Sequence, residues 1–161
     1  MKKILLIRHG DYLKCDDEDP GLNADGAFQA QSLGAKLRNM ERHGGEYDQR
    51  HVAASESRRT QETARIAGAQ TIDTYDFLGE VPHDLEDEEL KRLTELAWIP
   101  GVALDAGRVA LEELRRIKPN VVYSHGLKIA GITAVARLMA GQPLEGEPLR
   151  LEHCGIRELI I

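Results

Sequence analysis

One short apolar run constrains the fold of this chain more than any other stretch. Four apolar residues, Ile4-Leu5-Leu6-Ile7, lead directly into Arg8-His9-Gly10. The run predicts a short buried strand, and the glycine lets the backbone turn sharply after it. We therefore expect the arginine and the histidine at the carboxyl edge of a sheet, where open α/β folds bind ligands. An arginine there indicates a bound anion, and a histidine indicates a nucleophile or a proton carrier.

Strand and helix patterns alternate along most of the chain. Short apolar runs predict further strands at 51–54, 71–74 and 121–123, with two more within 149–161. Apolar spacing and capping residues predict helices from Asn23 to about Arg42, after Ser55 to about Ala67, over Glu86–Trp98 and from Asp105 to Ile117. They also predict a last helix that follows Gly126 and is stopped by Gly141. This order predicts a mainly parallel sheet with helices on both faces.

Composition narrows the class of protein. The 161 residues predict a single domain over 1–161 with enough chain to bury a core. The net charge of −6 argues against nucleic acid or an anionic membrane as partner. The apolar run after Lys2-Lys3 is too short for a signal peptide, and no segment reaches the length of a membrane span, so we expect a cytoplasmic protein. Cys15 and Cys154 form neither a disulfide framework nor a zinc motif and are expected to be free thiols.

Three predicted strands end in similar polar residues. They are followed by Arg8-His9-Gly10, by Ser55 with Arg58 and Arg59, and by Ser124-His125-Gly126. Parallel strands would bring these ends to one edge of the sheet. Two histidines and two or three arginines gathered there need an anion to neutralise them. Phosphate fits best, because arginine offers paired planar donors and a protonated histidine offers another.

Phosphoryl transfer to a histidine also needs a proton for the leaving oxygen. The predicted loop 75–86 offers five candidate donors, and spacing alone does not choose among them. These are Asp76, Glu80, His83, Asp84 and Glu86.

At this point the chain resembles the histidine phosphatase superfamily, also called phosphoglycerate-mutase-like. Four motifs carry the resemblance and fall in the family's order over most of the chain. They are Leu6-Ile7-Arg8-His9-Gly10, then Leu22-Asn23-Ala24-Asp25-Gly26 with Gln29-Ala30, then Ser55 with Arg59-Thr60-Gln61-Glu62-Thr63-Ala64, and finally Val121-Val122-Tyr123-Ser124-His125-Gly126.

The resemblance implies a three-layer α/β/α sandwich and a phosphohistidine intermediate on His9. No metal or cofactor is expected, because two arginines and a histidine supply the positive charge. It implies that Arg8, Arg59 and His125 hold the phosphate, with His125 also part of the catalytic set. Counting back from Thr63-Ala64 selects Arg59 rather than Arg58, which becomes a surface neighbour. The family's acid often follows a Leu-x-Glu pattern, which Leu78-Gly79-Glu80 matches and which points to Glu80 as the proton donor.

Departures from the family pattern affect the expected function. Glu56 replaces the usual proline after Ser55, and Asp11-Tyr12 replace the Glu-Thr or Glu-Ser of the mutases and sugar-phosphate phosphatases. The chain is also too short for the insertions of cofactor-dependent mutases. It is more similar to the short bacterial phosphatases, which include phosphohistidine protein phosphatases.

We therefore expect a phosphatase that acts on a phosphomonoester or a protein phosphohistidine. Its partner would be a phosphorylated small molecule or a phosphoprotein, and the oligomeric state stays open. A mutase-type phosphotransferase and a non-catalytic phosphate-binding scaffold are the alternatives. The acidic loops 11–21 and 75–86 would discourage highly anionic substrates such as bisphosphates. We expect His43 and His51 at the surface and assign His153 a structural role.

Overall fold

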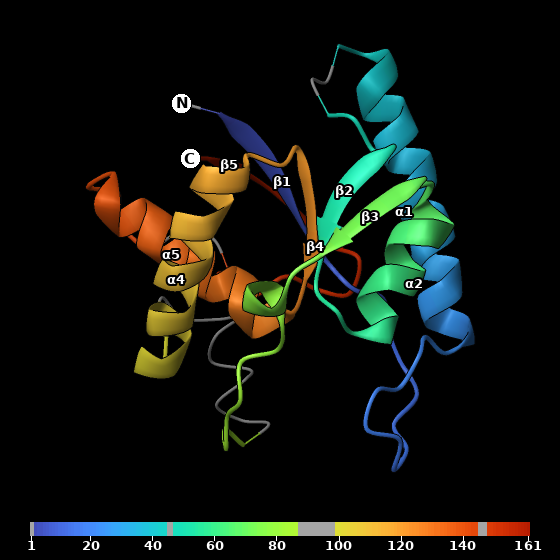
Figure 1. Ribbon diagram of the computed structural model, residues 1–161, viewed down its shortest axis with the longest axis horizontal. Helices are drawn as coiled ribbons and strands as arrows, with labels where there is room; N and C mark the ends of the chain where they lie inside the picture. Colours follow the sequence, from blue (N-terminus) through green and yellow to red (C-terminus); the bar gives the residue numbers. More distant parts are fainter. Residues whose placement is uncertain (1, 45–46, 87–98, 145–147) are drawn as a thin grey trace.

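The computed structural model describes residues 2–44, 47–86, 99–144 and 148–161. Within these ranges, one sheet has five strands in the order β3-β2-β4-β1-β5 (Figure 1). Their bounds are Lys3–Arg8 for β1, His51–Ala54 for β2, Thr71–Thr74 for β3, Val121–Ser124 for β4 and Ile156–Ile160 for β5. The first four strands run parallel to one another, and β5 pairs antiparallel with β1. The predicted mainly parallel sheet is confirmed.

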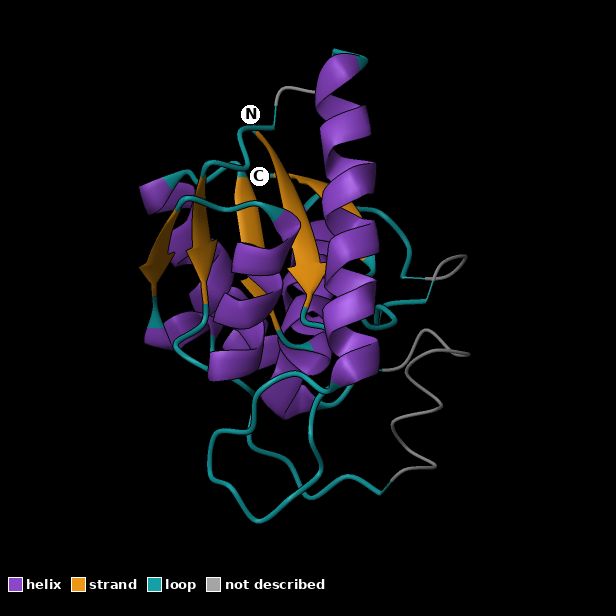
Figure 2. Ribbon diagram, turned by 90° about the vertical axis from the view of Figure 1, so that its right-hand side faces the viewer, coloured by secondary structure: helices purple, strands orange, loops and turns teal. Residues whose placement is uncertain are grey.

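Helices cover both faces of this sheet. Helices α1 (Ala24–Arg42) and α2 (Arg58–Ala67) lie on one face, and α4 (Gly101–Ile117) and α5 (Gly126–Met139) lie on the other (Figure 1, Figure 2). A short 3₁₀ helix, η1 (Asp76–Leu78), follows β3. The arrangement is the predicted three-layer α/β/α sandwich.

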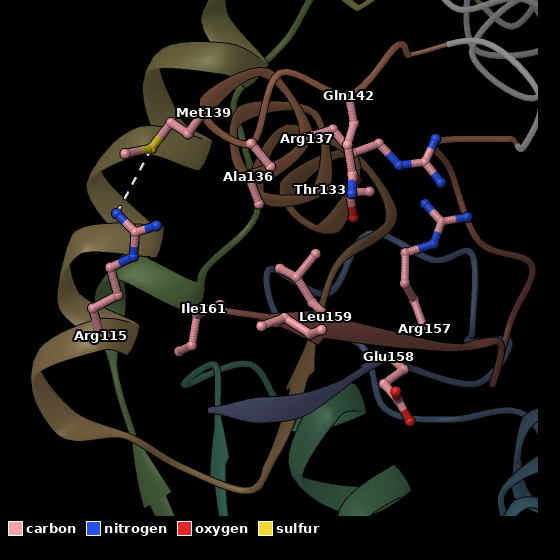
Figure 3. Close-up of a pocket in the computed structure, with 12 residues that line it drawn as sticks. Arg115, Thr133, Ala136, Arg137, Met139, Gln142, Arg157, Glu158, Leu159 and Ile161 are labelled. Atoms are coloured by element: carbon pink, nitrogen blue, oxygen red, sulfur yellow. Dashed lines mark hydrogen bonds between the residues drawn. The ribbon is translucent and has the colours of Figure 1, made fainter. Parts of the chain in front are cut away.

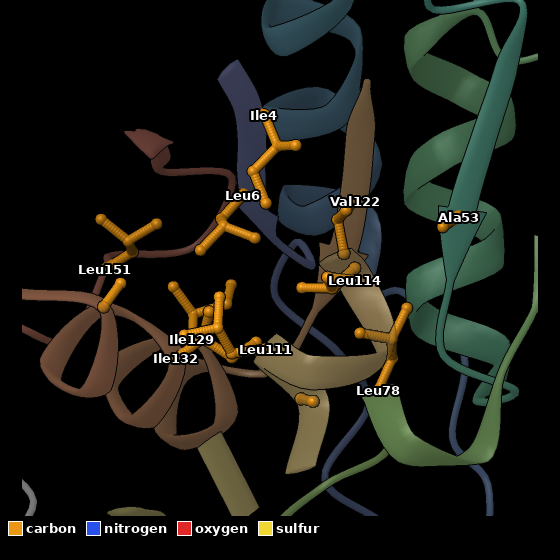
Figure 4. Packing of buried hydrophobic residues seen from close by; sticks show 12 residues of the cluster. Ile4, Leu6, Ala53, Leu78, Leu111, Leu114, Val122, Ile129, Ile132 and Leu151 are labelled. Carbon is orange, nitrogen blue, oxygen red and sulfur yellow. The ribbon is translucent and has the colours of Figure 1, made fainter. Parts of the chain in front are cut away.

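The alternation of side chains along β1 produces the two halves of the core. Ile4 and Leu6 pack against α4 and α5 (Figure 4), whereas Leu5 and Ile7 pack against α1 and α2. All four side chains are buried. Burying such a side chain contributes about 1.5–3 kcal/mol, so β1 is anchored from both sides and forms a stiff support for the residues that follow it.

Helices α4 and α5 approach each other closely through glycines. A Cβ atom on Gly107 would lie 2.2 Å from the carbonyl carbon of Gly131, and one on Gly131 would lie 2.0 Å from the Ala103 carbonyl oxygen. Neither position has room for a side chain. This close contact fixes α5, whose first residue immediately follows His125.

The predicted start of a helix at Asp105 is wrong. Helix α4 begins at Gly101 with Pro100 as its N-cap, and Asp105 lies within the helix, where its carboxylate pairs with Arg108. The fixed φ of Pro100 and its missing N–H suit the start of a helix. Asp105 was expected there only because aspartate is a common N-cap residue.

The C-terminal segment contains one strand, not two. Residues 149–155 form no strand, because the chain turns at Cys154, whose φ is 54°. Leu149 and Leu151 are nevertheless buried, which accounts for the strand-like apolar pattern. The prediction of a helix over Glu86–Trp98 falls largely on residues 87–98, which lie outside the described residues.

The remaining element predictions are confirmed, including the capping of α1 by Asn23. Both cysteines are free, and His43 and His51 are exposed. No helix in the described part of the chain is both long and apolar enough to span a membrane.

Candidate active site

The candidate site lies where the parallel strands end. Arg8 at the end of β1 pairs with Ser124 at the end of β4, and Ala54 at the end of β2 pairs with Tyr123. The residues that follow these strands, among them His9 and His125, therefore meet at one edge of the sheet. The imidazole rings of His9 and His125 have their centroids 5.1 Å apart.

A close backbone contact fixes the loop after His9. A Cβ atom on Gly26 would lie 1.8 Å from the carbonyl oxygen of Asp11, so only glycine fits at this position near the start of α1. Asn23 caps the helix by accepting a hydrogen bond from Gly26 N and also donates to the Asp11 carboxylate. Gln29 accepts from the Asp11 backbone N–H at 2.9 Å. The Asn-Ala-Asp-Gly motif and Gln29 thus hold the turn that follows the histidine.

His9 is held in one orientation in a buried position. Its side chain is only 3% exposed, and its Nδ1 lies 2.7 Å from the carbonyl oxygen of Gly10. A carbonyl only accepts, so Nδ1 carries the proton and Nε2 keeps the lone pair. Burial, and then the neighbouring His125, lower the pKa of His9 to about 2. The residue is therefore a neutral imidazole whose Nε2 is available as a nucleophile.

His125 is neutral for similar reasons, and its proton is directed by its partners. Arg59 Nη2 lies 3.3 Å from His125 Nδ1, and because arginine only donates, Nδ1 accepts. His125 Nε2 then carries the proton and donates to Ser55 Oγ at 2.9 Å. Burial, and then the Arg59 charge, lower the pKa of His125 to about 3. Ser55, the first residue after β2, thus orients the ring.

The two arginines that are adjacent in the sequence lie in different environments, as expected. Arg58 is exposed and pairs with Glu62, while Arg59 is 5% exposed and lies beside His125. Arg59 Nη2 also donates to Glu80 Oε2 at 2.5 Å. Its Nε is buried and has no hydrogen-bond partner among the described residues. A buried, unpartnered N–H on a cation is costly unless a ligand accepts from it.

Arg8 is held on its outer side by the C-terminal segment. Its Nη1 donates to the Leu151 carbonyl at 2.8 Å, and its Nη2 lies 3.0 Å from His153 Nε2. Its Nε, like that of Arg59, is buried without a partner in the described part of the chain. Burial, and then repulsion from Arg150, lower the pKa of Arg8 to about 10, which leaves the guanidinium charged at neutral pH.

Sequence reasoning missed His153 and Tyr12 as parts of this site. The ring of His153 lies 5.6 Å from that of His9, and the ring of Tyr12 lies 5.5 Å from it. The Tyr12 ring also packs against Arg59, with 4.8 Å between the ring centroid and the guanidinium carbon. The purely structural role assigned to His153 overlooked this position. No pattern in the sequence marks the position of His153, because it depends on the antiparallel pairing of β5 with β1, which sets Ile156 opposite Ile7.

A cavity of about 360 Å³ opens beside Arg59 and His125. Of the five candidate acids, Asp76 and Glu80 line it, while His83, Asp84 and Glu86 do not. Glu80 is 54% exposed and reaches Arg59 from the mouth of this cavity.

A larger cavity of about 510 Å³ lies at the opposite end of the parallel strands, between α4, α5 and β5 (Figure 3). Its lining is mainly apolar and arginine side chains, including Leu159, Ile161 and Arg157. Arg59, Glu80 and His125 line the smaller cavity and not this one. Among the residues that the structure describes, no group of three or more His, Cys, Asp or Glu side chains is placed to hold a metal ion.

Comparison with known families agrees with this geometry. The model of the histidine phosphatase superfamily, branch 1, matches residues 4–97. The chain belongs to the histidine phosphatase superfamily. The match includes His9, Arg59 and Glu80, and the structure adds His125 from outside the matched range.

Solved structures show the same histidine phosphatase fold. A phosphoserine phosphatase from Entamoeba histolytica, solved with 3-phosphoglyceric acid, is 22% identical, with 99% of this chain and 91% of that one covered and a TM-score of 0.67. A mycobacterial glucosyl-3-phosphoglycerate phosphatase, solved with VO3, is 18% identical, with coverages of 99% and 91% and a TM-score of 0.65. An open reading frame product from Mycobacterium tuberculosis is 24% identical, with coverages of 98% and 90% and a TM-score of 0.66. No curated protein matches the chain.

Proposed function

We propose that this histidine phosphatase hydrolyses a phosphomonoester or a protein phosphohistidine through a phosphohistidine intermediate on His9, without a metal ion. One observation carries the proposal. A buried, neutral His9 with its lone pair on Nε2 lies beside two arginines, and each arginine has a buried N–H without an acceptor among the described residues. A phosphoryl group supplies both the electrophile for the imidazole and the acceptors for the arginines.

In the first step, the substrate phosphate lies against Arg8, Arg59 and His125. His9 Nε2 attacks phosphorus, and the bond from phosphorus to the leaving oxygen breaks. Glu80, which lines the same cavity beside Arg59, gives a proton to that oxygen. The arginines neutralise charge on the transferring oxygens, which is the main contribution to phosphoryl transfer.

In the second step, Glu80 takes a proton from a water molecule that attacks the phosphohistidine. The nitrogen–phosphorus bond breaks, inorganic phosphate forms, and His9 returns to its neutral state. The similar solved structures support this assignment, since two of them are phosphatases and one was solved with VO3, a mimic of the transferring phosphoryl group.

The decisive experiment combines turnover with trapping of the intermediate. We expect wild-type protein to hydrolyse para-nitrophenyl phosphate and to give an acid-labile phosphoenzyme on rapid quenching, and we expect His9→Ala to lose both. His51→Ala, at an exposed histidine near the other end of β2, is the matched control and keeps both. Near-normal turnover in folded His9→Ala would refute the intermediate, and phosphate binding without turnover in wild type would instead support a binding protein.

The role of Glu80 has its own test. Glu80→Gln slows hydrolysis of an alkyl phosphate more than that of para-nitrophenyl phosphate, because only the poor leaving group needs the proton. Equal slowing of both substrates would count against Glu80 as the acid.

A further inference from the structure

The candidate site carries positive charge in its inner part and negative charge in its outer part. The inner part of the 360 Å³ cavity is lined by the buried Arg59 and the neutral His125, and its outer part is lined by carboxylates from three segments of the chain. These carboxylates, which we call the acidic rim, are Glu18, Asp19, Glu56, Asp76 and Glu80. All five residues are exposed.

Backbone N–H groups hold two of the five carboxylates of the acidic rim. Asp19 accepts hydrogen bonds from the backbone N–H of Arg58, and Asp76 accepts one from the backbone N–H of Phe77. Such donors orient these carboxylates but do not cancel their charge. The Arg58 side chain forms its ion pair with Glu62, and Asp19 has only a weaker electrostatic influence on it.

Two further cations lie near the acidic rim. Glu80 pairs with Arg59. Lys128 attracts Asp76 electrostatically, but its side chain is buried on the His125 side of the site. Among the residues that the structure describes, the mouth of this cavity therefore carries more negative than positive charge, above a positively charged floor.

The floor independently points to an anionic ligand. Arg59 lines the same cavity, is 5% exposed, and has a buried Nε with no acceptor among the described residues. A phosphoryl group bound there leaves the rest of its molecule facing the rim. From this polarity, and resting on the proposed function, we infer that the preferred substrates carry a positive charge on the leaving part, as in an amine-bearing phosphomonoester or a phosphorylated residue in a basic peptide.

Matched substrates test this inference. Phosphoethanolamine and phosphoglycolate are two-carbon phosphomonoesters that end in an ammonium and a carboxylate group. We expect kcat/KM to be about tenfold higher for phosphoethanolamine at low ionic strength, and the ratio to shrink in high salt, because the screening length falls from about 10 Å at 0.1 M to about 3 Å at 1 M. A second arm compares phosphopeptides with lysine or glutamate flanks, and its preference relative to the small pair tells which source of cationic substrate is used.

A double variant connects the preference to the rim. Glu18→Gln with Glu56→Gln removes two rim charges that take part in no ion pair described above, so we expect the ratio of phosphoethanolamine to phosphoglycolate kcat/KM to fall severalfold. Glu112→Gln, at an exposed position on α4, is the control and keeps the wild-type ratio.

The outcomes separate this inference from the proposed function. Turnover of para-nitrophenyl phosphate with no preference for cationic substrates in either arm would overturn the inference alone. A preference that is present but unchanged in the double variant would likewise overturn only the inference. Absence of turnover with every substrate would overturn the proposed function itself.

Discussion

The support of Arg8 by His153 leads to a sharp prediction. His153→Phe keeps a ring of similar shape but removes the Nε2 acceptor that lies 3.0 Å from Arg8 Nη2. Arg8 retains its hydrogen bond to the Leu151 carbonyl, so the guanidinium stays in the site with one anchor instead of two. We expect the variant to bind and turn over phosphate esters less well without unfolding.

The size of the effect follows from the hydrogen bond. A bond to a charged group contributes about 1.5–3 kcal/mol. Arg8 is only partly buried, so water can replace part of the lost acceptor, and the lower end of this range applies. About 1.5 kcal/mol corresponds to a loss of roughly tenfold in kcat/KM.

The assay is steady-state hydrolysis of para-nitrophenyl phosphate across a pH series, with thermal unfolding as a check on stability. His153→Gln, which restores an acceptor, should recover part of the lost activity. His51→Phe removes an exposed histidine away from the site and should not change kcat/KM. A folded His153→Phe protein within twofold of wild type at every pH would refute the reasoning.

Three further predictions follow from the structure. Because His9, His125 and His153 have folded pKa values of about 2, 3 and 4 against an ordinary 6.5, the unfolded chain binds more protons below pH 6.5. The three histidines therefore stabilise the fold fully above pH 6.5, and this contribution is lost on acidification. We expect the free energy of unfolding, measured with urea, to fall by about 3–4 kcal/mol from pH 6 to pH 5. An unfolding free energy that does not change with pH would contradict this. Gly107→Ala places a Cβ against the Gly131 backbone and should lower the free energy of unfolding by about 1–3 kcal/mol. The control Gly101→Ala meets open space and should leave the protein equally or slightly more stable. Equal urea midpoints for the two variants would count against the close contact. Excess EDTA should leave the para-nitrophenyl phosphatase rate unchanged, and a loss restored by added divalent metal would show that a metal takes part.

Local patterns explain why so much of the fold was predictable. The burial of Ile4–Ile7 on both faces follows from a continuous apolar run, and the start of α1 follows from the cap at Asn23, which bonds only three residues ahead. The prediction was wrong where one sequence pattern is compatible with two structures. Helix α4 begins after Pro100 rather than at Asp105. The apolar residues Leu149 and Leu151 are buried although they form no strand.

The sequence alone determined which residue types end the parallel strands, because strand ends and short motifs depend on neighbours along the chain. That is why Arg8, His9 and His125 could be expected at one edge of the sheet in advance, whereas the choice of Arg59 over Arg58 came from the family resemblance. Tertiary structure decided how these groups are charged and supported. His153 reaches Arg8 only because β5 pairs antiparallel with β1, and His9 is neutral mainly because the surrounding layers exclude water from it. Burial and pairing across the chain are properties of the folded molecule, and spacing along the sequence does not record them.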